Sequence, residues 1–534
     1  MSDEDLNHFC GIVAVYHLAH RGVSPIVPGE NLNSVTKLIP RMLLDIQSRG
    51  QLAAGITSFS RDRRQRLNTY KQLGTVHEAF HLSRREQFER IMDDHVAPAA
   101  IGHVRYATCE VDDRDSSQPF ERKHSRLWKW YSFAFNGQLA NYQELKREFL
   151  ASKDHHLMRD SDSELLMHSI SEGLRGEIEP SIRGLFAKLA EKLEGAWNIV
   201  FLNAQGDMVV ARDPMGFRPL SWAFDGSLFA AAIEDVALAN AGFKNVHTLG
   251  PGELVHVRED RPPEVVRFAE NEKTAHCVLE WVYFANVAST LDHSSVYSAR
   301  AAMGEDLANL ELARARVPID EDTIVVPVPD TAKPAADAMA FRLKIRSMEG
   351  VIRNRYVGRT FIQGSGDRSE RAKMKYTPIR KVLEGKRVLL VEDTIVRATT
   401  MLALLREIRD RGQAKEIHVR VACPPIIGPC FYGLDVSTVS ELFVPSILGQ
   451  TVCDEKGEQI LADALGVESL HFLPLDSLSR GIGIDEKHLC EACITGRHPS
   501  DAGARLYKLA LHNACCQVKR TERTYEIDDT YEEI

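Results

Sequence analysis

The chain has 534 residues, which is long enough for two or more domains with full hydrophobic cores. Its 44% apolar and 26% charged residues are typical of a globular protein, and a net charge of −9 argues against a general nucleic-acid-binding surface. No run of about 18 apolar residues occurs, so we expect neither a transmembrane helix nor a membrane partner.

The N-terminal segment leads into a short apolar strand. Residues 1–9 are acidic and polar and lack the basic and apolar regions of a signal peptide, so we expect a cytoplasmic protein whose cysteines are reduced thiols, metal ligands or catalytic groups. The sequence CGIVAVY follows from Cys10 and predicts a strand. A cysteine in such a strand is usually an inert buried thiol, and only its wider context favours chemistry.

Five further motifs follow this cysteine within about two hundred residues. They are RGQLAAG from Arg49, GHVRYAT from Gly102, FNGQLAN from Phe135, SDSE from Ser161 and RDPMGFRPL from Arg212. Taken singly they are weak: an Asn-Gly pair is a common hairpin turn, and SDSE is a typical helix start with a capping box. Residues 197–202 and 208–211, separated by a polar turn, predict a β-hairpin.

Taken together and in this order, the motifs resemble the glutaminase domain of class II glutamine amidotransferases. The resemblance implies an N-terminal-nucleophile hydrolase αββα sandwich and removal of residues 1–9. Cys10 would then be the nucleophile, and its own α-amine, which titrates near neutral pH, would carry the thiol proton. It also implies an oxyanion hole from Asn136 and Gly137. Glutamine would bind through Arg105 and Thr108 at its carboxylate and Asp162 at its ammonium group.

A second half begins after PGE at Pro251 and a charged, proline-containing stretch, which predicts a domain boundary at residue 255. Strand-like segments then alternate with helical ones, as in a parallel sheet. One of them, RVLLVEDTIVRATT from Arg387, reads as a buried strand, an acidic pair, a hydroxyl-rich turn and a helix start. Backbone N–H groups at such a helix start can hold a phosphate, and the two acids can receive ribose hydroxyls directly or through Mg²⁺.

This half resembles the type I phosphoribosyltransferases, which use phosphoribosylpyrophosphate (PRPP). Both halves in this order resemble the glutamine PRPP amidotransferase family of purine synthesis. That resemblance implies that the loop 363–375 closes over PRPP. The residues that it assigns to PRPP are Asp330, Thr331, Arg355, Tyr356, Arg359, Glu392, Asp393, Thr394, Arg397, Ala398, Thr399 and Thr400, with Mg²⁺ at Glu392 and Asp393.

Two departures from the family pattern bear most on the phosphoribosyl site. Ala398 stands where the family has glycine, and a methyl group there would crowd the 5′-phosphate. The sequence Asn286-Val287-Ala288 replaces Arg-Pro-Asp and removes a cation and an anion together. These differences leave two alternatives open: a diverged paralogue whose glutaminase serves another acceptor, and a nucleotide-binding regulator without activity.

Four of the ten cysteines match the family branch that carries a [4Fe–4S] cluster. They are Cys277, Cys430 and the C-x-x-C pair Cys490 and Cys493. Four thiolates suit such a cluster or Zn²⁺, and the match in all four positions favours the cluster.

We therefore expect a two-domain enzyme with α/β and α+β architecture. Its parts would be a leader (1–9), a glutaminase domain (10–255), a phosphoribosyltransferase domain (256–480) and a C-terminal helical segment (481–534) with an acidic tail. The expected reaction makes 5-phosphoribosylamine, glutamate and diphosphate from PRPP and glutamine. The resemblance also implies purine nucleotide feedback inhibitors and a homotetramer or homodimer.

Overall fold

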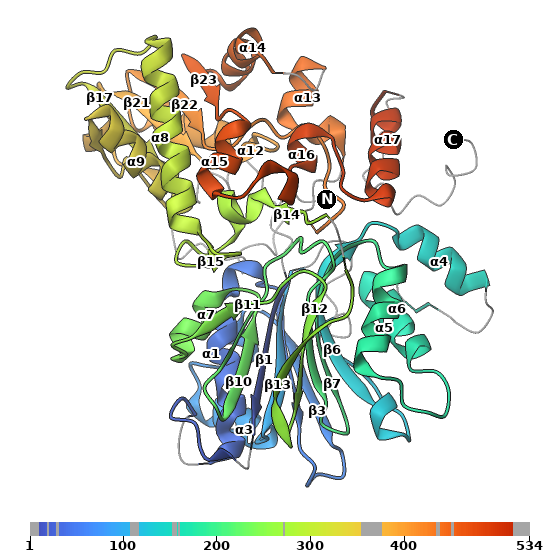
Figure 1. Cartoon of the computed structure of the whole chain (residues 1–534). Helices are drawn as coiled ribbons and strands as arrows, with labels where there is room; N and C mark the ends of the chain where they lie inside the picture. Colours follow the sequence, from blue (N-terminus) through green and yellow to red (C-terminus); the bar gives the residue numbers. More distant parts are fainter. Residues whose placement is uncertain are drawn as a thin grey trace.

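The chain folds into two lobes that follow each other in sequence (Figure 1). A computed structural model describes residues 10–18, 21–27, 31–106, 117–151, 157–158, 161–270, 273–353, 376–433, 438–449 and 453–515. None of the helices in these ranges combines the length and apolar composition needed to cross a bilayer.

The first lobe consists of two antiparallel sheets packed face to face. The seven-stranded sheet has the order β11-β9-β10-β1-β4-β2-β3 and the six-stranded sheet the order β13-β12-β8-β7-β6-β5. The strands are β1 (Gly11–His17), β2 (Ala53–Phe59), β3 (Leu67–Leu73), β4 (Ala99–Arg105), β5 (Phe120–Arg122), β6 (Tyr131–Leu139), β7 (Gly195–Asn203), β8 (Met208–Ala211), β9 (Ser221–Phe224), β10 (Leu228–Ala232), β11 (Val246–Thr248), β12 (Glu253–Arg258) and β13 (Arg261–Arg267).

Helices cover the outer faces of both sheets. They are α1 (Leu38–Asp45) and α7 (Asp235–Ala241) beside the first sheet, and α4 (Tyr142–Ala151), α5 (Asp162–Gly173) and α6 (Ile182–Lys192) beside the second. Alternate residues of β6 enter different cores: Ala134 lies in the core between the sheets, and Phe135 lies in the core beneath the helices. The predicted αββα sandwich is therefore present.

Two local features of this lobe test the sequence analysis. The predicted hairpin is β7–β8, and its strands pair from Ile199 opposite Ala211 to Leu202 opposite Met208. The strands β12 and β13 form another hairpin within the same sheet. This sheet therefore continues to Arg267, beyond the boundary expected at residue 255.

The second lobe contains a five-stranded parallel sheet with the order β18-β17-β21-β22-β23. Its strands are β17 (Thr323–Pro327), β18 (Arg346–Ser347), β21 (Arg387–Glu392), β22 (Glu416–Val421) and β23 (Ser469–Phe472). Its larger helices are α8 (Val296–Arg314), α9 (Lys333–Leu343), α12 (Thr399–Asp410), α14 (Glu455–Leu465), α15 (Asp476–Ile482) and α17 (Asp501–Cys515). Strands β17, β21 and β22 are buried along nearly their whole length, as a sheet covered on both faces requires.

The described residues contain further α-helices and strands. They are α2 (Val76–Ala79), α3 (Arg85–Asp94), α11 (Arg380–Leu383), α13 (Phe443–Leu448), α16 (Ala492–Thr495), β14 (His276–Cys277), β15 (Thr290–Leu291), β16 (Ser294–Ser295), β19 (Val351–Arg353), β20 (Tyr376–Pro378) and β24 (Leu489–Cys490).

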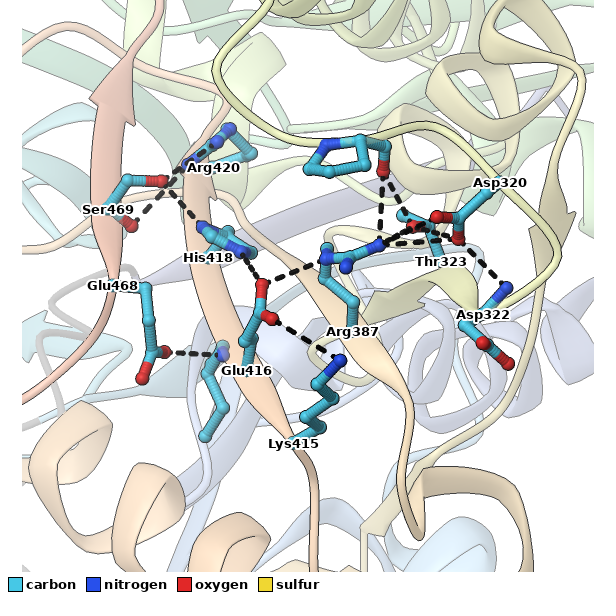
Figure 2. A network of polar contacts seen from close by, with 12 residues as sticks. Asp320, Asp322, Thr323, Arg387, Lys415, Glu416, His418, Arg420, Glu468 and Ser469 are labelled. Atoms are coloured by element: carbon cyan, nitrogen blue, oxygen red, sulfur yellow. Dashed lines mark hydrogen bonds and ion pairs between the residues drawn. The ribbon is translucent and has the colours of Figure 1, made fainter.

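A polar network lies at the amino ends of the parallel strands (Figure 2). Arg387, the first residue of β21, donates to Glu416 on β22 at 2.8 Å and to Asp320 at 3.2 Å. These contacts connect the amino ends of the strands. Because β17 and β21 run parallel, the polar residues that follow their carboxyl ends lie together at the opposite edge of the sheet. Ligands bind at that carboxyl edge in sheets of this kind.

Four buried charged side chains join the two lobes. Arg49 contacts both Glu234 and Glu280, the latter at 2.7 Å, and Arg218 contacts Glu280 at 2.8 Å. All four are at most 1% exposed. Burial alone would lower the pKa of Arg49, but the two carboxylates outweigh burial and raise it. Since Glu280 lies in the second half of the chain, these ion pairs tie that half to the glutaminase-like sandwich.

We predict that E280L strongly destabilises the junction between the lobes. The substitution leaves two buried guanidinium groups without this carboxylate, and such a loss costs about 3–5 kcal/mol. Urea unfolding followed by tryptophan fluorescence should show an earlier transition. D476N breaks an ion pair with Arg480 whose side chains are 58% and 72% exposed, and this control should leave the transition in place. Equal midpoints for E280L and wild type would contradict the prediction.

Candidate active sites at the two strand edges

Cys10 lies at the amino end of β1, inside one end of the sandwich. The side-chain amide Nδ2 of Asn136, on β6, donates to the Cys10 carbonyl oxygen. Burial raises the pKa of the Cys10 thiol, whereas the Tyr106 backbone N–H and the charge of Arg105 oppose that rise. The fold thus brings together Cys10, Arg105 and Asn136, which come from three of the predicted motifs.

Gly137 occupies a position that only glycine can take. Its φ is +151°, and a Cβ atom would lie 1.8 Å from the carbonyl oxygen of Ala196 on the neighbouring strand β7. The Asn136-Gly137 pair is therefore part of the long strand β6 and not the hairpin turn that the dipeptide commonly forms.

The other candidate glutamine ligands are placed at element ends. Arg105 is the last residue of β4 and is 6% exposed, and Asp162 is the first residue of α5. Ser161 caps α5 by accepting from the Glu164 N–H at 3.3 Å, as predicted. In a full capping box the Glu164 carboxylate would also accept from the Ser161 N–H. Among the described residues it accepts from the Met158 N–H at 2.8 Å instead. Thr108 lies outside the described residues.

The acidic pair lies at the carboxyl edge of the parallel sheet. Glu392 ends β21, and Asp393 follows it and is 5% exposed. Asp393 accepts from the hydroxyl of Thr331, beyond the end of β17, and from that of Thr394 at 2.9 Å. Burial raises the pKa of Asp393, although these hydroxyls and the charge of Arg300 oppose the rise. A buried carboxylate of this kind favours a nearby cation.

A phosphate-sized anion can be held where α12 begins. Ala398, the N-cap of this twelve-residue helix, has a left-handed backbone with φ +59° and supplies no side-chain cap. Backbone N–H groups of the first turn, which contains Thr399 and Thr400, therefore face this end of the helix. Arg397 forms an ion pair with Glu441 at 2.8 Å.

The remaining predicted PRPP residues are less informative. Asp330 is largely exposed and lies 3.8 Å from Arg353 in an ion pair. Arg355, Tyr356, Arg359 and the predicted closing loop 363–375 lie outside the described residues.

The four predicted cluster cysteines are all buried. Cys277 and Cys490 are partners in the parallel pair β14–β24. Three of the sulfurs accept a backbone N–H from the second residue after the cysteine: Leu279 to Cys277, Ala492 to Cys490, and Tyr432 to Cys430 at 3.3 Å. The pKa of Cys277 is raised to about 12, chiefly by burial; the charge of Arg218 opposes the rise and the neighbouring Cys430 adds to it. Burial likewise raises the pKa of Cys493, and Cys430, Cys277 and Cys490 add to the rise.

Among the described residues, no three His, Cys, Asp or Glu side chains are arranged as a site for a metal ion. Cys277, Cys430, Cys490 and Cys493 are close enough for their charges to affect one another's pKa values. The described side chains do not form the compact arrangement of ligands that a single metal ion needs.

Sequence reasoning missed three buried residues around these sites. Arg300, on α8, is 3% exposed and donates to the carbonyl oxygens of Trp281 and Ala285 at 2.8 and 2.9 Å. Glu234 accepts from the Asn286 N–H at 2.8 Å and from the Ser289 hydroxyl at 2.6 Å. Cys423 is buried where its pKa is raised, first by burial and then by the charge of Asp393. One signal in the sequence could have indicated such residues: a charged residue at a helix position whose neighbours on the same face are apolar. Arg300 occupies such a position on the buried face of α8.

Comparison with known proteins agrees with this division into two sites. The glutamine amidotransferase domain family matches residues 53–248, and the phosphoribosyl transferase domain family matches residues 310–429. The fold and sites thus define a glutaminase joined to a phosphoribosyltransferase.

Full-length relatives carry the same combination. The amidophosphoribosyltransferase of Methanothermobacter thermautotrophicus is 34% identical over 518 residues, which are 96% of this chain and 99% of the relative. That of Bacillus subtilis is 33% identical over 464 residues, 86% of this chain and 90% of the relative. The solved structure of the B. subtilis glutamine PRPP amidotransferase, complexed with ADP and GMP, matches with a TM-score of 0.76 at 30% identity. It covers 92% of this chain and 98% of that one.

The chain belongs to the amidophosphoribosyltransferase family. It is a pentosyltransferase that carries out glutamine-dependent amidotransfer to PRPP in purine synthesis. The expected family, fold class and reaction are thereby confirmed.

We predict that A398G strengthens PRPP binding. Glycine removes the methyl group beside the helix start, which would otherwise crowd the 5′-phosphate. The KM for PRPP should fall about fivefold, as measured by diphosphate release.

A315G is the matched control, because Ala315 has the same left-handed backbone (φ +47°) at the end of α8. It should leave the KM for PRPP unchanged. A KM that is unchanged in A398G, or that changes equally in both variants, would contradict the prediction.

Proposed function

We propose that Cys10, once residues 1–9 are removed, attacks the side-chain amide of glutamine. The α-amine takes the thiol proton and passes it to the departing ammonia, leaving a thioester that water hydrolyses to glutamate. Asn136 has two amide hydrogens and uses one for the Cys10 carbonyl. The second, with the Gly137 N–H, would stabilise the oxyanion. Arg105 and Thr108 would bind the substrate carboxylate and Asp162 its ammonium group.

In the second lobe, the released ammonia attacks C1 of PRPP as the bond from C1 to the diphosphate breaks. The start of α12, with Thr394, Arg397, Ala398, Thr399 and Thr400, would hold the 5′-phosphate, and Asp330, Thr331, Arg355, Tyr356 and Arg359 would lie near the diphosphate. Glu392 and Asp393 provide hard carboxylate oxygens that suit Mg²⁺, which would neutralise charge on the leaving group. The raised pKa of buried Asp393 supports a cation there.

One continuous stretch of chain supports internal transfer of ammonia. The Ala422 N–H donates to the Glu392 carbonyl at 2.8 Å, and the Gly433 N–H donates to Gln138 Oε1 at 3.0 Å. Gln138 follows Gly137 directly on β6. Residues 422–433 thus extend from the acidic pair to the proposed oxyanion hole, so a single segment of the chain contacts both proposed sites.

Cys277, Cys430, Cys490 and Cys493 would hold a [4Fe–4S] cluster. Four thiolates are the ligand set that a [4Fe–4S] cluster requires. The three backbone N–H groups that point to these sulfurs, and the nearby Arg218, would stabilise thiolate charge. The cluster would be structural and would attach the C-terminal segment to the second lobe.

Two solved relatives support a proposal about regulation. One solved relative was determined with ADP and GMP, and another is described as the allosteric regulatory enzyme of purine biosynthesis. We propose that purine nucleotides inhibit this enzyme by feedback, and that it works as a homodimer or homotetramer in the cytoplasm.

We predict that the purified protein begins at Cys10 and that C10A loses glutamine-dependent activity. Mass spectrometry of the N-terminal peptide tests the first statement. Diphosphate release with glutamine should fall at least about 1,000-fold in C10A, because no other group supplies the nucleophile. Release with added ammonium salt should stay within about twofold, since the second site is untouched.

C453A removes a partly buried thiol that the proposed chemistry does not use, and it should match wild type in both assays. Glutamine-dependent release by C10A, or a mature protein that begins at Met1, would contradict the proposed nucleophile.

We predict about four iron atoms per chain in protein purified without oxygen, with the visible absorption of an iron–sulfur cluster. C490S should lose most of the iron, whereas C453S should retain it. One zinc ion per chain, or iron retained in C490S, would contradict the cluster.

A further inference from the structure

Two amide oxygens lie inside the sandwich without a donor. Asn136 on β6 and Asn198 on β7 are 2% and 0% exposed. The Oδ1 atom of each is buried and accepts no hydrogen bond from the residues that the structure describes. Leaving one such buried acceptor unpaired costs about 1–3 kcal/mol. Two such acceptors on paired strands indicate that a donor belongs near them.

The strand register places the two side chains next to each other. Asn136 and Asn198 are directly opposite in the antiparallel pair β6–β7. Residues of the same parity, Ala134 and Val200, lie in the core between the two sheets, so both asparagines face that space. The Nδ2 group of each asparagine is already engaged: that of Asn198 donates to the Pro219 carbonyl at 2.8 Å, and that of Asn136 to the Cys10 carbonyl. These contacts fix which way each amide points.

The nitrogen of Cys10, whose carbonyl accepts from Asn136, is a group that can change its donor count. Bond lengths put the nitrogen and the carbonyl carbon of one residue about 2.5 Å apart, so this nitrogen lies close to Asn136. As part of a peptide bond it carries one N–H. As a free terminus it becomes an ammonium group with three N–H donors.

We propose that Asn198, together with the Oδ1 atom of Asn136, holds the α-ammonium group of Cys10 that removal of the leader exposes. This assignment rests on the proposed function of Cys10. Asn198 is then a positioning residue for the group that carries the proton during glutamine cleavage. It lies outside every motif used to identify the glutaminase.

The charges around Cys10 explain why such acceptors are needed. Arg105 and His103 both lie on β4. The charge of Arg105 disfavours a second cation nearby, and burial holds the pKa of His103 at about 3, so His103 is neutral. At the same level of β6 and β7 the inward residues are the two asparagines. Two carbonyl dipoles directed at the α-amine offset the influence of Arg105 and keep its pKa near neutral, where it can both accept and release a proton.

The test measures the pKa of the α-amine directly in the mature full-length protein. Trace acylation over a range of pH, followed by mass spectrometry of the N-terminal peptide, reports this pKa without requiring activity. We expect it to fall by about 1 in N198L, which removes the acceptor, and to rise by about 1 in N198D, which replaces it with a carboxylate. The acid limb of glutaminase kcat/KM should move to lower pH in N198L and to higher pH in N198D.

V200A is the matched control, because Val200 faces the same core two residues along β7 and has no polar side-chain atom. It should lower the thermal midpoint without moving the pKa of the α-amine. An α-amine pKa that is the same in N198L and wild type would overturn the proposal and indicate a water molecule between the two oxygens. Shifted pKa values in a protein that does not cleave glutamine would support the role of Asn198 and refute the proposed function instead.

Discussion

The buried ion pairs among Arg49, Glu234, Glu280 and Arg218 are the contact on which the two-site arrangement depends. Charges at most 1% exposed are stable only when paired, so each partner requires the others in place. Because Glu280 comes from the second half of the chain, this requirement fixes how the lobes meet. Arg49 also directly precedes Gly50, where a Cβ atom would lie 2.7 Å from the Arg105 backbone. The junction between the lobes is therefore packed directly against Arg105, a proposed glutamine ligand.

Residues 422–433 extend this connection through the second lobe. Their N–H groups reach the Glu392 carbonyl at one end, the Cys493 carbonyl from Ile427 and Gly428, and Gln138 at the other end. Phe217 and Tyr432 stack with ring centroids 4.3 Å apart across the same junction. The proposed cluster, the PRPP edge and the proposed oxyanion hole are thus held by one short run of backbone. A structural cluster at this place would stabilise both sites at once.

Both sites rely on unusual backbone at a single residue. Gly137 takes a conformation and a close approach that no side chain permits. Ala398 takes a left-handed conformation in which alanine is strained, at the start of the helix proposed to bind phosphate. Glycine suits the backbone conformation at position 137, whereas alanine does not suit the left-handed conformation at position 398. From this contrast we expect Ala398 to affect the strength of PRPP binding more than the identity of the reaction.

The amino-acid sequence by itself determined the family, the two folds in order, the acidic strand β21 and the cysteines, because each is carried by a short run of neighbouring residues. Tertiary structure alone decided the ion pairs between Arg49 and Glu280, which are 231 residues apart, and the continuation of the first sheet through β13. It also decided the pairing of Asn136 with Asn198. The reason is physical: local patterns set secondary structure and motif chemistry, whereas the partner of a buried polar group depends on how distant strands are brought together.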